Sequence, residues 1–174
     1  MKSIGKTAPI LLAAFFAQNA LTAPTGDAAS TNATVKTQDS IDIQRLMDSY
    51  HEAVVTHDGA RLARLFIPEG SAWLNVLSDD AYARAKAKSP DAKKIRVGSF
   101  KDFAELVSHT KANFDPRHTH LQINSDGTIA SVYFDFIFLS DGKETNHGSE
   151  TWQLVKGTDG WNIAAITYSS NPTT

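Results

Sequence analysis

The C-terminal third of the chain alternates strand-like runs with Asp-Gly pairs, and this alternation restricts the fold more than any other feature. The runs are HTHLQIN (118–124), TIASVYFDFIFL (128–139), HGSETWQLV (147–155) and WNIAAITYS (161–169). Each connecting segment contains Asp-Gly, which favours a tight hairpin between β-rich runs. We therefore expect four strands joined as an antiparallel meander.

The sequence before the meander has the spacing of helices. Apolar residues recur every three or four positions over 43–54, which predicts a helix that Asp39 or Ser40 caps. Asp58 and Ser99 cap two further predicted helices. The other predictions here are a short strand over 71–77, a surface helix or excursion over 79–94, and a stop at Pro116. Helices followed by a meander predict an α+β domain, with the helices on one face of a curved antiparallel sheet.

The N-terminal segment has the features of a secretory signal. Lys2 and Lys6 precede an apolar run that is too short to span a membrane, and small residues follow it. We expect a signal peptide over 1–23 with cleavage near Ala23, although an uncleaved anchor is the alternative. Residues 24–39 are expected to form a flexible leader, and 40–174 a single domain. The mature protein is then secreted or periplasmic, with no membrane attachment.

Composition excludes several classes of function. The 174 residues contain no cysteine, which rules out disulfides, thiolate catalysis and Cys-ligated zinc. The formal net charge is −2, so the chain lacks the basic excess that is typical of nucleic-acid-binding proteins. No phosphate-binding glycine loop or dinucleotide-binding motif is present either, and no cofactor is expected.

Two segments resemble a known superfamily. SYHEAVVTHDGARLARLFIPEG (49–70) and GSETWQLVKGTDGWNIAAITYS (148–169) are similar to the opening and closing of nuclear transport factor two-like proteins. This resemblance implies a cone, in which a strongly curved sheet wraps around a long first helix, with a small-molecule cavity at the wide end. It also implies a homodimer formed through the sheet. The superfamily includes ketosteroid isomerases, scytalone-type dehydratases and polyketide cyclases, so the fold does not select an activity.

The motif RHTHLQI (117–123) raises the possibility of a metal site. In a regular strand, His118 and His120 point to the same face. A metal needs a third and usually a fourth ligand, and no glutamate follows the two histidines, while Asp126 falls in the expected turn. We therefore expect no bound metal.

The same motif resembles the dehydratase pattern in which a catalytic histidine follows an arginine by three residues. By this resemblance His120 is the candidate general acid–base group, a role that suits imidazole. His51, from the first helix, and Asp135, within a strand, are candidates to assist it. The dehydratases' helix-one aspartate corresponds to Val55, which weakens the comparison. By the same resemblance, the face of the strand that carries Ser149 and Thr151 is expected to point inward. The expected ligand-binding residues are these two together with Tyr50, Trp73 and Tyr133.

Three functions remain open from the sequence. The leading hypothesis is a protein that binds a small apolar or aromatic molecule, without established catalysis. The second is a cofactor-independent lyase or isomerase, which requires His120, His51 and Asp135 to converge on one cavity. A ketosteroid isomerase mechanism is disfavoured, because its base would fall near Leu74. The third is a dimeric association module, which requires a filled cone without a cavity.

Overall fold

The computed structural model describes residues 28–173, with side chains described from residue 38 onward. The predicted signal peptide over 1–23 lies outside the described residues. Within the described part of the chain, no helix is long and apolar enough to cross a membrane.

The first helix, α1 (Ala28–Val55), is much longer than the sequence prediction. It includes most of the segment that was expected to be a flexible leader. Neither Gly nor Pro occurs between Ala28 and Val55, so the backbone meets no strong helix breaker there. Asp39 lies inside the helix and does not cap it. This residue is buried, and it accepts hydrogen bonds from Lys156 Nζ at 2.8 Å and Ser125 Oγ at 3.0 Å.

Six strands form one sheet in the order β2-β1-β6-β5-β4-β3. Strands β3 to β6 pair antiparallel in succession, which confirms the predicted meander, whereas β1 runs parallel to β6. This arrangement leaves β2 and β3 at the two edges of the sheet. The strands are β1 (Ala72–Leu77), β2 (Ile95–Val97), β3 (Phe114–Ser125), β4 (Ile129–Ser140), β5 (Lys143–Gly157) and β6 (Gly160–Ser170).

Three short helices connect the first helix to the meander. They are α2 (Gly59–Ala63), α3 (Asp79–Lys88) and α4 (Phe100–His109). The predicted caps Asp58 and Ser99 are confirmed, because their side chains accept backbone N–H groups of the first turn. α4 ends at His109, earlier than predicted. Pro116 instead lies in β3, where an edge strand can accommodate a proline.

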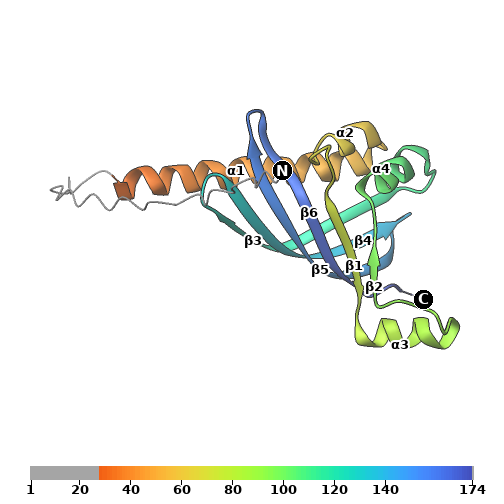
Figure 1. Cartoon of the computed structure of the whole chain (residues 1–174). Helices are drawn as coiled ribbons and strands as arrows, with labels where there is room; N and C mark the ends of the chain where they lie inside the picture. The colour runs from red at the N-terminus through yellow and green to blue at the C-terminus, as the bar shows by residue number, and fades with distance from the viewer. Residues whose placement is uncertain (1–27, 174) are drawn as a thin grey trace, which may run out of the picture.

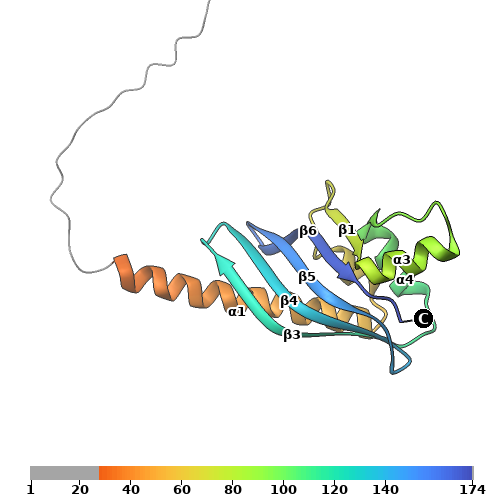
Figure 2. The ribbon, with the colours of Figure 1, turned by 90° about the horizontal axis from the view of Figure 1, so that it is seen from below.

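The helix α1 lies along one face of the curved sheet (Figures 1 and 2), which we call the inner face. α2 and α4 lie at the end of the sheet where α1 finishes, and α3 lies beyond β1 and β2. The core joins α1 residues such as Ile43, Met47 and Val54 to Val132 and Ile166 on the sheet. The predicted α+β cone is confirmed: helices pack in a curved, unclosed, mainly antiparallel sheet.

Candidate functional site

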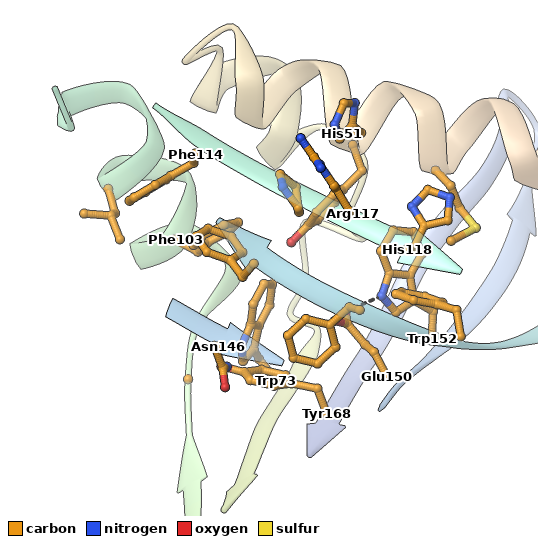
Figure 3. Close-up of a pocket in the computed structure, with 18 of the residues that line it drawn as sticks. His51, Trp73, Phe103, Phe114, Arg117, His118, Asn146, Glu150, Trp152 and Tyr168 are labelled. Atoms are coloured by element: carbon orange, nitrogen blue, oxygen red, sulfur yellow. Dashed lines mark hydrogen bonds between the residues drawn. The ribbon is translucent and has the colours of Figure 1, made fainter. Parts of the chain in front are cut away.

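A cavity of about 440 Å³ lies between α1, α4 and the inner face of the sheet. Figure 3 shows the cavity with its lining side chains. Its volume contradicts the filled cone that an association module without a ligand requires. Nine aromatic residues line it: Tyr50, Trp73, Phe103, Phe114, Phe134, Phe136, Phe138, Trp152 and Tyr168.

The alternation of β4 and β5 decides which residues face this cavity. Phe134 and Phe136 point inward on β4, and their register places Glu150 and Trp152 inward on β5. The expected inward face of Ser149 and Thr151 is therefore wrong. Those residues share the outer face with Tyr133 and Asp135, because successive side chains of a strand point to opposite sides. Of the five predicted ligand-binding residues, Tyr50 and Trp73 line the cavity.

A β-bulge separates the two histidines of the sequence motif. The pairing of β3 with β4 shifts between Thr119 and Gln122, and His120 has a φ of 55°. A bulge interrupts the alternation of side chains along a strand, so the prediction that both histidines share a face is wrong. His118 lines the cavity. His120 is exposed, and its Nδ1 lies 2.9 Å from Asp135 Oδ2.

The predicted catalytic convergence is consequently wrong. His51 lines the cavity from α1, but His120 and Asp135 lie on the outer face. Ser149 Oγ donates to the second carboxylate oxygen of Asp135 at 2.8 Å. The hydrogen bonds from Ser149 and His120 lower the pKa of Asp135. This outer-face group is held together by its own contacts and does not reach the cavity.

Glu150 is the acidic group of the inner face. The indole N–H of Trp152 donates to its Oε1, as the dashed line in Figure 3 shows. Removal of the carboxyl from water raises its pKa to about 7, since burial disfavours the charged form. The pKa of Tyr50 is also raised, first by burial and then by the negative potential of Glu150. The Tyr50 and Trp152 rings lie 5.0 Å apart, which fixes both beside the carboxyl.

His118 is the inward-facing histidine on β3. Its ring meets the Phe134 ring edge-on at 5.7 Å. Desolvation, followed by the positive potential of His51, lowers the pKa of His118. None of the described residues forms a hydrogen bond with either nitrogen of this ring. Both nitrogens are therefore available to a molecule in the cavity.

Three titratable or charged side chains, His51, Asp115 and Arg117, form a hydrogen-bonded group between α1 and the edge strand β3, beside the cavity. His51 Nε2 lies 3.0 Å from Asp115 Oδ1, and Arg117 Nε donates to Asp115 Oδ2 at 2.8 Å. The hydrogen bond with His51 is the main cause of the lowered pKa of Asp115. These contacts tie α1 to the edge of the sheet.

Sequence reasoning did not select Glu150 and His118, two titratable residues of the cavity lining. The signal for Glu150 was present, because Glu150 and Trp152 alternate with Ser149 and Thr151 and one pair had to face inward. Within the described residues, no group of three or more His, Asp or Glu side chains is placed to hold a metal ion.

Solved structures share this architecture across most of the chain. An NTF2-like protein of unknown function from Shewanella baltica matches with a TM-score of 0.56 and 16% identity, over 79% of this chain and 97% of that one. A candidate scytalone dehydratase from Novosphingobium aromaticivorans matches with a TM-score of 0.60 and 17% identity, over 82% and 90%. A candidate dehydratase of the NTF2-like family from Streptomyces avermitilis gives 0.56 and 16%, over 80% and 99%.

No model of a protein family matches the chain, and no curated protein matches its sequence. The likeness is therefore one of three-dimensional structure at low sequence identity. It agrees with the order of helices and strands and with the resemblance of the opening and closing segments. The chain has the nuclear transport factor two-like fold, also described as cystatin-like.

Proposed function

We propose that this protein binds a small, mainly aromatic or apolar molecule in the conical cavity. The main support for this proposal is the cavity of about 440 Å³ with nine aromatic side chains in its wall. Pockets for small molecules commonly have volumes of about 300–1,000 Å³ and mostly apolar walls with a few polar groups. Glu150 and His118 supply those polar groups here.

A cavity-filling substitution tests this proposal. Phe138 lines the cavity from β4, and Phe138→Trp should reduce its free volume. Ile129→Trp, on the exposed outer face of the same strand, is the matched control. We expect 2-naphthol to quench the fluorescence of Trp73 and Trp152 in the wild type and the control, with binding at least about fivefold weaker in Phe138→Trp. Native mass spectrometry of the purified protein should also detect a retained small molecule. If the protein retains nothing and 2-naphthol does not bind, the proposal is wrong.

A second candidate function is a cofactor-independent lyase or isomerase. The observation that favours it is that the pKa values of two residues lining the cavity are shifted in opposite directions. The pKa of Glu150 is raised to about 7, and that of His118 is lowered. Just below pH 7 the carboxyl can donate a proton and the neutral imidazole can accept one, which is the pattern of an acid–base pair. Two of the similar solved structures are described as candidate dehydratases.

The reaction would be loss of water from a β-hydroxy ketone. His118 would take the proton next to the carbonyl as the double bond forms. Glu150 would protonate the departing hydroxyl, so that water leaves. The two residues lie on β3 and β5, on either side of β4, roughly 10 Å apart from strand spacing alone, which leaves room for a ring.

Conversion of a cyclic β-hydroxy ketone into the α,β-unsaturated ketone, followed by proton NMR, tests this second function. Conversion should be lost in Glu150→Gln and in His118→Gln, and kept in the outer-face variant His120→Gln. Ligand binding without conversion in the wild type would leave binding as the function and exclude this chemistry.

Two further proposals concern the protein outside the cavity. The basic and apolar pattern of residues 1–23 supports export, so that the protein acts in a secreted or periplasmic form. Exposed apolar side chains on the outer face of β4, Tyr133 and Ile137, support a homodimer formed through the sheet. Neither proposal changes the residues that line the cavity.

A further inference from the structure

Given the cavity binding proposed above, the wall also indicates a class of ligand. We infer that the cavity is built for an organic cation: an amine or quaternary ammonium group on an aromatic or alicyclic body, with its positive charge beside Glu150. The inference rests on three features, which are the rings around Glu150, the free oxygen of its carboxyl, and the charges of the other lining residues.

Aromatic rings from three elements, α1, β4 and β5, line the cavity together with Glu150. Phe134 stands opposite Glu150 in the β4–β5 register. Trp152 lies 5.5 Å from the Phe134 ring and 5.0 Å from the Tyr50 ring, measured between centroids. Aromatic faces attract cations through their quadrupole, and such contacts recognise quaternary ammonium groups in particular. A cation held here would contact rings from α1, β4 and β5.

Only one of the two carboxyl oxygens of Glu150 has a hydrogen-bond partner among the described residues. Trp152 donates to Oε1, and no described residue forms a hydrogen bond or ion pair with Oε2. A carboxylate removed from water without a cation is unfavourable, and such a group protonates instead. The raised pKa of Glu150 has this cause. An ammonium group beside Oε2 would supply the missing partner and keep the carboxyl ionised.

The remaining titratable and charged groups of the described lining include no unpaired, permanently charged cation. They are Tyr50 and His51 on α1, Asp102 on α4, Arg117 and His118 on β3, and Tyr168 on β6. Of the described lining residues, Arg117 alone carries a permanent positive charge, and Asp115 already binds it. Asp102 adds a negative charge. An anionic ligand would therefore face Glu150 and Asp102 without an unpaired cation to offset them.

A matched pair of compounds tests the inference. Naphthylmethyl-trimethylammonium and its all-carbon analogue, neopentylnaphthalene, have the same shape and differ in charge. Binding to the full chain is followed by tryptophan fluorescence. We expect Glu150→Gln to weaken the cation about tenfold or more, as for loss of a contact with a charged group. The all-carbon analogue should change less than about twofold. Glu105→Gln, at an exposed acidic residue of α4 outside the lining, is the control and should change the affinity for the cation by less than about twofold.

The pH dependence of the wild type gives a measurement that does not depend on a variant. The quaternary ammonium does not titrate, so its affinity follows the ionised fraction of Glu150. With a pKa of about 7, that fraction, and hence the affinity, rises about tenfold from pH 6 to pH 8. Any slope that remains in Glu150→Gln measures the share of the other titratable groups of the lining.

Each outcome decides between the proposals. Tighter binding at pH 8 together with a Glu150-dependent preference for the cation supports the inference. Equal responses of the cation and the carbon analogue to Glu150→Gln overturn the cation inference and leave cavity binding intact. Failure of both compounds and of 2-naphthol to bind overturns cavity binding as well. Binding of the cation that weakens as pH rises would also contradict the inference, since Glu150 would then act in its protonated form.

Discussion

Phe134 and Glu150 stand directly opposite each other in the pairing of β4 with β5. Cross-strand partners project to the same face of a sheet. Because Phe134 points to the inner face, Glu150 points there as well. The carboxyl therefore lies in the aromatic lining of the cavity, where the indole N–H of Trp152 donates a hydrogen bond to it. This register explains the raised pKa of Glu150 and places a titratable group where a ligand would lie.

The first prediction concerns stability and pH. The pKa of Glu150 rises from 4.5 to about 7 on folding, so the folded chain holds the proton more tightly than the unfolded chain. The resulting stabilisation is fully present below pH 4.5 and is lost as pH rises to about 7. The loss in the free energy of unfolding is about 3 kcal/mol at most. Glu150→Gln should remove this pH dependence and be more stable than the wild type at pH 8.

Urea unfolding at pH 4.5, 6, 8 and 9 measures the difference between the two proteins. The free-energy gap should open as pH rises through 7 and change little between pH 8 and pH 9. A gap that stays constant over this range would show that Glu150 titrates in the same way in both states. Asp102→Asn, which removes a different acid from the lining, should not reproduce the change.

Much of the fold could be predicted because its signals are local. Asp58 and Ser99 cap helices wherever their side chains can reach the free N–H groups of a first turn, and Asp-Gly favours a hairpin independently of the rest of the chain. The start of α1 was missed for the opposite reason. The Ala- and Thr-rich segment 28–38 carries little apolar periodicity. Asp39 has the properties of a helix cap in the sequence, and only the folded structure shows that it binds the distant Lys156 instead.

The site depended on contacts that no local pattern contains. The bulge near His120 turns one histidine of the motif inward and the other outward, and bulges have no strict sequence signature. The inward face of β5 was assigned by resemblance to dehydratases, although Phe134 and Phe136 already indicated which side of β4 is apolar. Combining that side with the hairpin register would have selected Glu150 and Trp152. A one-residue difference in register reverses every side chain.

The second prediction concerns the buried ion pair between α1 and the last hairpin. Asp39 is 1% exposed and binds Lys156 Nζ and Ser125 Oγ. Asp39→Ala should lower the free energy of unfolding by about 2–4 kcal/mol, because it leaves Lys156 without its partner in a partly buried place. Asp42→Ala, which breaks an exposed pair with Arg45, should lower it by less than about 1 kcal/mol. Similar losses from both variants in urea unfolding would contradict the special role of Asp39.

The third prediction concerns the outer face as a dimer interface. Tyr133 and Ile137 are 42% and 43% exposed and point away from the cavity on β4. Introducing charge at the centre of an apolar contact should abolish it. We expect light scattering coupled to gel filtration to report a dimer for the wild type and a monomer for the double variant Tyr133→Asp/Ile137→Asp. Binding of 2-naphthol should be unchanged. A monomeric wild type would rule out this interface.

The last prediction separates the two histidines of the opening motif. His120 has a positive φ of 55°, a conformation that Asn tolerates and β-branched residues disfavour. His120→Asn should therefore fold and bind the cavity ligand as the wild type does, whereas His120→Val should lose about 1–3 kcal/mol of stability. His118→Asn keeps a polar group but shortens it beside Phe134, so it should weaken ligand binding with little change in stability. Fluorescence titration and urea unfolding of the three variants measure both properties. Of the two histidines of the motif, His118 is the one that faces the cavity. Loss of ligand binding in His120→Asn, with binding intact in His118→Asn, would therefore place the functional histidine on the outer face.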